Sequence, residues 1–206
     1  MSTKTRQTPE KLLNQARFSI AAAEPGQWPR APGAEVAFAG RSNVGKSSAI
    51  NAITRQRSLA RTSKTPGRTR QIVFFELGEG RRLVDLPGYG YARVPEHLRL
   101  SWAGLIEEYL TVREDLKGLI LLMDIRHPLT ELDRQMLQWC EPRGLPVHIL
   151  LAKSDKLRRA QAGRAELAVT HHAATLAIPV TVQQFSALKR AGVEEAQVRI
   201  RDWLTG

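Results

Sequence analysis

Cysteine is nearly absent from this chain, since Cys140 is the single thiol among 206 residues. One thiol cannot form a disulfide within the chain, so nothing in the sequence requires an oxidising compartment. We therefore expect Cys140 to be a small buried hydrophobic residue. Long apolar runs are missing too: none approaches the roughly 20 residues of a membrane-spanning helix, and residues 20–23 are too short for a signal-peptide core. These absences predict a cytoplasmic protein with no membrane segment.

Acidic residues are scarce relative to basic ones, with 20 Asp and Glu against 31 Lys and Arg and a formal net charge of +11. Such an excess indicates a polyanionic partner such as nucleic acid, with an acidic lipid surface as the weaker alternative. Internal repeats and low-complexity segments are also lacking. The length suits a single domain with its own hydrophobic core and short tails.

The apolar pattern alternates between short strands and helices along most of the chain. Strands are expected at 35–39, 72–77, 82–86, 118–123, 147–152 and 180–185, and helices at 46–53, 96–112, 131–141, 160–176 and 194–204. Gly78-Glu79-Gly80 joins the second and third strands as an antiparallel hairpin. The alternation predicts an α/β fold, a mostly parallel sheet with one antiparallel edge hairpin and helices on both faces. Residues 1–33 are expected to be an N-terminal extension that packs on a single domain of residues 34–206.

A glycine-rich loop lies between the first expected strand and the first long helix. Its sequence, residues 40–47, matches the phosphate-binding P-loop pattern. The glycines let successive backbone amides face a phosphate, and the helix N-terminus adds partial positive charge. Lys46 would bridge the outer phosphates, and the Ser47 hydroxyl would be a ligand of Mg²⁺. The predicted nucleotide contacts in this loop are Gly40, Arg41, Ser42, Asn43, Val44, Gly45, Lys46 and Ser47. An accidental glycine-rich turn is the alternative, and the flanking strand and helix disfavour it.

A second short motif, Asp85-Leu86-Pro87-Gly88, lies at the end of an expected strand. There the Asp85 carboxylate can reach Mg²⁺ through water, and the Gly88 amide can meet a γ-phosphate. Taken alone the motif could be an ordinary Pro-Gly turn. Its spacing after a P-loop and a hairpin favours the phosphate-switch interpretation.

Two further loops predict which base is bound. Ala152-Lys153-Ser154-Asp155 ends a buried strand, and Asp155 can accept hydrogen bonds from N1 and the exocyclic amine of guanine, a pattern that adenine does not offer. Lys153 would lie over the ring. Phe185-Ser186-Ala187 follows the last strand, where the Ala187 amide could meet the guanine O6. A solvated loop is the alternative for each motif alone, and together they favour GTP.

These motifs, with KTPGRTR at 64–70, DLPGYGYA at 85–92, the stretch 124–133 and FSALK at 185–189, resemble the EngB family of ribosome-biogenesis GTPases. The resemblance covers most of the chain. It implies a monomeric, Mg²⁺-dependent switch that binds GTP and GDP, hydrolyses GTP slowly and assists assembly of the large ribosomal subunit through its rRNA and proteins. It also implies a role in cell division and septum formation.

The same resemblance implies that Thr69 binds Mg²⁺ in the GTP state, with Thr65 and Thr62 as alternatives. The nucleotide contacts that it implies in this segment are Gly67, Arg68, Thr69, Arg70 and Gln71. Basic residues crowd the same region, namely Arg55, Arg57, Arg61, Lys64, Arg68 and Arg70. Such a run is commonly a solvated face, but a segment that changes order with the nucleotide could also bind a partner.

Three positions bear on affinity and mechanism. Ala152 stands where the family usually has Thr and GTPases at large have Asn, and one missing hydrogen bond costs about 0.5–1.5 kcal/mol of GTP binding. Tyr89 stands where Ras-like proteins place the glutamine that orients water, so we expect slow hydrolysis, assign no catalytic residue and expect Tyr89 to pack with Tyr91. Asn43 leaves two interpretations open: an asparagine that caps local backbone, or, by resemblance, a residue that recruits K⁺.

Two other functions compete with a GTPase switch. A P-loop ATPase is disfavoured by Asp155 and Ser186, which suit guanine. An RNA-binding module with a weakened nucleotide site would need a broken P-loop, whereas Lys46, Ser47 and Asp85 are intact.

Overall fold

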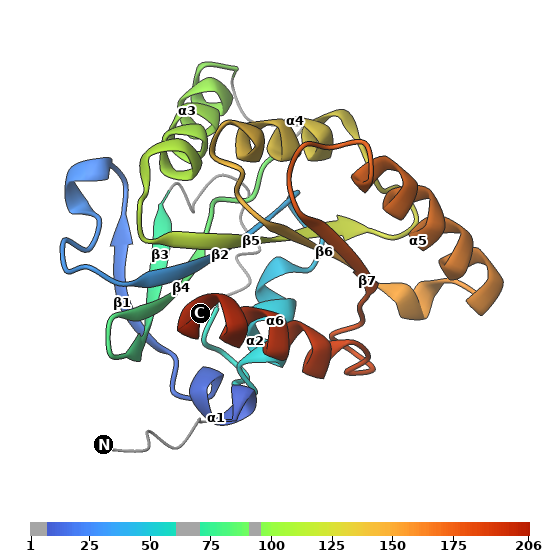
Figure 1. Cartoon of the computed structure of the whole chain (residues 1–206), viewed down its shortest axis with the longest axis horizontal. Helices are drawn as coiled ribbons and strands as arrows, with labels where there is room; N and C mark the ends of the chain where they lie inside the picture. The colour runs from blue at the N-terminus through green and yellow to red at the C-terminus, as the bar shows by residue number, and fades with distance from the viewer. Residues whose placement is uncertain (1–7, 61–70, 91–95) are drawn as a thin grey trace.

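The computed structural model describes residues 8–60, 71–90 and 96–206 and contains a seven-stranded sheet in the order β1-β3-β4-β2-β5-β6-β7 (Figure 1). The strands are β1 Arg17–Ala22, β2 Ala34–Gly40, β3 Ile72–Gly78, β4 Arg81–Asp85, β5 Leu116–Asp124, β6 Val147–Ala152 and β7 Val180–Gln184. The α-helices are α1 Pro9–Leu13, α2 Lys46–Ile53, α3 Glu96–Val112, α4 Glu131–Cys140, α5 Arg159–Ala173 and α6 Val193–Thr205. Each element expected from the sequence is present, with ends shifted by a few residues.

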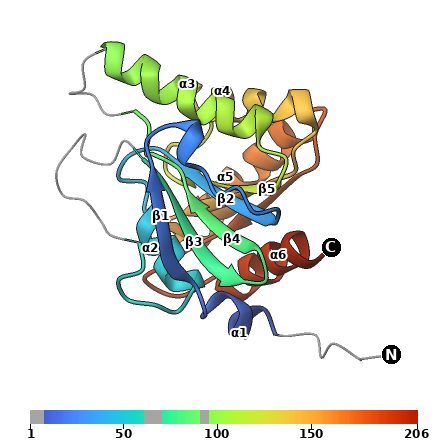
Figure 2. The same cartoon turned by 90° about the vertical axis from the view of Figure 1, so that its left-hand side faces the viewer.

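The sheet is mostly parallel, as predicted. β3 pairs antiparallel with both β1 and β4, and the remaining neighbours pair in parallel. The hairpin of β3 and β4 is not at the edge of the sheet, because β1 forms the outermost strand beyond it (Figure 2). Residues 17–22, within the segment that we expected to be an extension, are therefore part of the sheet.

Strand β1 has no sequence signal strong enough to predict it. Phe18 and Ile20 are exposed, and Ala22 is the one residue of the strand that is buried. Because neither face is consistently apolar, the alternation that marks a half-buried strand is missing. Pairing with β3, whose Phe74 and Phe75 are buried on opposite faces of the sheet, defines this strand.

Helices cover both faces of the sheet in two layers. Helices α3, α4 and α5 pack on one face, and α1, α2 and α6 pack on the other (Figure 1). The central strands β2, β5 and β6 are almost entirely buried, as expected for parallel strands covered on both sides. Cys140 at the end of α4 is buried, which confirms its predicted role, and burial raises the pKa of its thiol to about 12. Among the described helices, none is both long and apolar enough to cross a bilayer.

A buried cluster of charged side chains holds the start of β2 in place. The Glu35 carboxylate accepts hydrogen bonds from Arg113 Nη2 at 2.5 Å, Tyr109 Oη at 2.8 Å and Arg82 Nη1 at 3.2 Å. Arg113 also donates to the carbonyl of Pro29 at 2.9 Å. Both oxygens of the buried Glu35 carboxylate therefore accept hydrogen bonds, and the cluster fixes one end of the sheet. The opposite end, where the parallel strands finish, carries the loops predicted to bind phosphate and base.

Candidate nucleotide-binding site

The P-loop connects β2 to α2 and is shaped by glycines. A Cβ atom on Gly40 would lie 2.8 Å from Val44 Cγ1 and 3.0 Å from the Leu122 carbonyl oxygen, so no larger residue fits there. Gly45 has a φ of +107° at the N-cap of α2, a conformation that favours glycine. The loop therefore turns tightly into the N-terminus of a helix, an arrangement that suits a chain of phosphates.

Lys46 and Asp85 meet at the centre of the site. Asp85 ends β4 beside Phe38 of the parallel strand β2, and Lys46 begins the helix that follows β2. The Lys46 ammonium donates a hydrogen bond to the Asp85 carboxylate, and both side chains are mostly buried. With the Ser47 hydroxyl in the same helical turn, the site offers an ammonium for phosphate oxygens and hard oxygen ligands that fit Mg²⁺.

The segment after Asp85 is tied to the P-loop through its backbone. The Leu86 amide donates to the Phe38 carbonyl at 3.0 Å, and the Ser42 amide donates to the Tyr89 carbonyl at 2.7 Å. Leu86 and Pro87 are buried, whereas Gly88 is partly exposed at the point where its amide was predicted to meet a phosphate. The two motifs predicted to bind phosphate are thus linked by backbone hydrogen bonds.

The Tyr89 side chain packs against α4. Its hydroxyl donates to Asp133 Oδ1 at 3.2 Å, and Asp133 Oδ2 accepts from the Thr130 amide and hydroxyl at the start of α4. Burial, reinforced by the Asp133 charge, raises the pKa of the Tyr89 phenol well above its usual value, so the phenol stays neutral. The packing that we expected with Tyr91 concerns a residue outside the described part of the chain. That packing stays a prediction, and the described contact of the Tyr89 hydroxyl is with the first turn of α4.

The two loops predicted to recognise the base lie together at the ends of β6 and β7. The Phe185 amide donates to the Leu151 carbonyl at 2.9 Å, and the Ser154 amide donates to the Phe185 carbonyl at 3.1 Å. The Ser186 hydroxyl donates to Asp155 Oδ1 at 2.6 Å, and this hydrogen bond lowers the pKa of the Asp155 carboxyl. Asp155 is therefore an ionised acceptor, as contact with N1 and the amine of guanine requires.

Lys153 bridges the base loop and the P-loop. Its ammonium donates to the Asn43 carbonyl at 2.8 Å and to Asp124 Oδ2 at 3.0 Å. Asp124, at the end of β5, also accepts from Arg126 Nη2 at 2.7 Å. The hydrogen bonds from Arg126, and then those from Lys153, hold the pKa of the Asp124 carboxyl well below its usual range. Our sequence-based prediction did not include Asp124, although an acid at the carboxyl end of a buried strand was a usable signal.

The remaining predicted residues have mixed outcomes. Ala152 is buried, and its carbonyl accepts the Ile125 amide at 3.0 Å, so the backbone of this position is fixed without the missing side chain. Gln71 is exposed immediately before β3, at the same end of the sheet as Asp85. Gly67, Arg68, Thr69 and Arg70, with the alternatives Thr62 and Thr65, lie outside the described residues, and their predicted contacts stay predictions.

Fold and site together define a P-loop GTPase. A family model described as 50S ribosome-binding GTPase matches residues 35–153, more than half of the chain. The "Probable GTP-binding protein EngB" of Aromatoleum aromaticum is 53% identical over 193 residues, covering 94% of this chain and 89% of that protein. Its counterpart in Azoarcus sp. is 55% identical over 194 residues, covering 94% and 93%. The chain therefore belongs to the EngB family of GTP-binding proteins.

Solved structures agree on the fold. A crystal structure of a probable GTP-binding protein engB has a TM-score of 0.66 at 22% identity and covers 83% of this chain and 98% of that one. Era of Aquifex aeolicus bound to GDP·AlF4⁻ has a TM-score of 0.64 at 20% identity, covering 85% and 58%. At these identities the likeness supports the fold alone.

Proposed function

We propose that this GTPase is a slow, Mg²⁺-dependent switch that acts in the cytoplasm and assists assembly of the large ribosomal subunit. The observation that carries the nucleotide part is the convergence of Lys46, Asp85, Lys153 and Asp155 at one end of the sheet. The ribosomal part is supported by the description of the matching family and by the net charge of +11. A role in cell division and septum formation is part of the proposal on the strength of the family resemblance alone.

Each part of the site has a defined task in this proposal. Lys46 and the P-loop amides bind the outer phosphates, and Asp155 with Lys153 binds guanine. Ser47 and Asp85, with Thr69 by resemblance, would hold Mg²⁺, which neutralises charge on the phosphate oxygens. Because the Tyr89 hydroxyl is engaged by Asp133, it is not positioned as a glutamine would be to orient water. Slow intrinsic hydrolysis is the expected consequence.

Titration of fluorescent GTP and ATP, with and without Mg²⁺, tests the nucleotide part. We expect GTP to bind more tightly than ATP, Lys46→Ala to abolish tight binding and Ser47→Ala to remove most of the Mg²⁺ dependence. Lys117→Ala is the matched control, because Lys117 is an exposed lysine near the other end of β5. Wild-type GTP affinity in the Lys46 variant, or equal affinity for ATP, would contradict the assignment.

Sedimentation with purified large ribosomal subunits tests the switch. In the presence of a non-hydrolysable GTP analogue we expect co-sedimentation that weakens steeply with salt, since each neutralised RNA phosphate adds about 0.7–0.9 to the slope of log affinity against log salt. GDP should weaken the association, because the contacts of Thr69 and Gly88 with the γ-phosphate are lost. Equal co-sedimentation with both nucleotides at every salt concentration would argue against a switch.

A further inference from the structure

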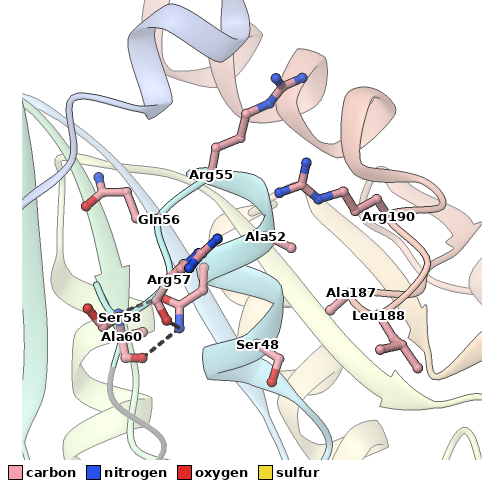
Figure 3. Close-up of a pocket in the computed structure, with 11 residues that line it drawn as sticks. Ser48, Ala52, Arg55, Gln56, Arg57, Ser58, Ala60, Ala187, Leu188 and Arg190 are labelled. Carbon is pink, nitrogen blue, oxygen red and sulfur yellow. Dashed lines mark hydrogen bonds between the residues drawn. The ribbon is translucent and has the colours of Figure 1, made fainter.

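A groove of about 950 Å³ lies next to the base-recognition loop (Figure 3). One side is formed by α2 and the residues that follow it, including Arg55 and Arg57, and the other by the loop that carries Leu188 and Arg190. We call it the arginine groove. It shares Ala187 with the base loop, but Lys46, Asp85 and Asp155 are not among the residues that line it. It is therefore adjacent to the nucleotide-binding site and separate from its ionic groups.

The groove carries positive charge alone. Arg55, Arg57 and Arg190 line it, and within the described part of the chain no Asp or Glu does. Glu10 of α1 pairs with Arg55 at 2.6 Å from outside the lining, but both side chains are more than a third exposed. An ion pair of that kind contributes little, so it can be exchanged for a stronger anion. The lining is thus complementary to phosphate groups.

Two of these arginines occupy backbone positions that usually take glycine. Arg55 follows Thr54, the C-cap of α2, with a φ of +53°, and Arg190 has a φ of +55°. A left-handed conformation costs a residue with a Cβ about 1 kcal/mol or more, and glycine is the common residue just after a helix. An arginine at both places costs folding free energy, which is typical of side chains that have a function at that position.

The size of the arginine groove and an exposed apolar side chain beside it indicate which kind of anion it binds. A cavity of about 950 Å³ is far larger than one phosphate group requires. Leu188 is 74% exposed on the same loop as Arg190, where it offers an apolar contact to a base or ribose. A concave groove admits a single strand, whereas an A-form duplex presents a convex surface of larger diameter. Single-stranded RNA therefore fits the shape and the charge together.

We propose that the arginine groove binds the sugar–phosphate backbone of single-stranded RNA, next to bound GTP. This inference rests on the proposed function and deepens it, because it assigns the contact with ribosomal RNA to one surface. The groove is built by α2, which starts at the P-loop, and by the loop that contains Ala187. Nucleotide contacts with these two elements would therefore set the width of the groove, which connects RNA binding to the nucleotide state.

The test compares the wild type with the double variant Arg55→Gly, Arg190→Gly. Glycine suits both left-handed positions, so we expect the variant to fold with a melting temperature equal to or above that of the wild type. The control is Arg159→Ala, Arg164→Ala, which removes two exposed arginines from α5 on the opposite face of the sheet. Both variants lose the same charge, so a difference between them reports on the groove.

The probe is a fluorescein-labelled oligouridine RNA of about 12 nucleotides, a length within the range that one single-strand site covers. Affinity is measured over a salt series in the presence of a non-hydrolysable GTP analogue. The groove variant should lose about 1.4 from the slope of log affinity against log salt, about 0.7 for each phosphate contact. The control should keep the wild-type slope, and both variants should keep wild-type GTP affinity.

In the RNA titration, each of the following results would overturn the proposal: no RNA binding by the wild type, equal RNA binding by the groove variant, an equal loss in the control, or a parallel loss of GTP affinity. The last would place the groove in the nucleotide-binding site. Polyglutamate that displaces the RNA at equal charge concentration would assign the groove to an acidic protein. Co-sedimentation with large subunits distinguishes a failure of the groove proposal from a failure of the proposed ribosomal function. A groove variant that sediments like the wild type removes this proposal alone, whereas a wild type that never sediments removes the proposed ribosomal function.

Discussion

Asp124→Asn is the substitution that tests how the base loop is connected to the P-loop. Lys153 donates to two acceptors, the Asn43 carbonyl and the Asp124 carboxylate, and the substitution weakens the second. A charged hydrogen bond contributes about 1.5–3 kcal/mol when buried. The Lys153 side chain is 31% exposed and that of Asp124 is 14% exposed, so solvent screening reduces this to about 1 kcal/mol.

A loss of about 1 kcal/mol corresponds to roughly fivefold weaker GTP binding. Fluorescence titration of a labelled GTP measures it, and thermal unfolding verifies that the variant is folded. Arg126→Ala is the matched control, because it removes the other partner of Asp124 and leaves Lys153 in place. We expect it to change GTP affinity less than about twofold. An unaltered affinity in Asp124→Asn, or an equal loss in Arg126→Ala, would refute the idea that Asp124 acts by positioning Lys153.

Three further predictions concern base choice, cations and pH. Asp155→Asn should exchange guanine preference for xanthine preference, because an amide donates where the carboxylate accepts; unchanged selectivity for GTP over XTP would show that another group reads the base. If Asn43 recruits a monovalent cation, GTP turnover should be faster in K⁺ than in Na⁺ at equal ionic strength. Equal rates would leave only the structural role, in which Asn43 stabilises the local backbone, and its φ of +61° is consistent with that role. Burial lowers the pKa of His148, which lies between Thr181 and Gln183 with Arg199 nearby. As the pH falls below about 6.5 the unfolded chain binds a proton that the folded chain does not, so the free energy of unfolding should decrease. His148→Gln should flatten that decrease between about pH 6.5 and 5, and an unchanged pH profile would exclude His148 as its source.

The sequence by itself determined those features that contiguous residues encode. The P-loop is one example, since the strand, the glycines that permit its turn, and Lys46 at the helix start follow each other directly. The central strands are another, because burial on both faces demands continuous apolar runs. Asp85 and Asp155 were predictable as site residues for the same reason: each lies at or just after the carboxyl end of a recognisable strand.

The tertiary structure alone decided the contacts between segments far apart in the chain. Strand β1 exists because β3 offers it an unpaired edge, which the composition of residues 17–22 does not reveal. Asp124 meets Lys153, 29 positions later, and Lys153 meets the carbonyl of Asn43, 110 positions earlier, because β5 lies between β2 and β6 in the sheet. Apolar periodicity shows which segments form strands, but it does not show the order in which those strands pair in the sheet. That order, set by how all the helices and strands bury their apolar faces together, brings these charged side chains to one end of the sheet.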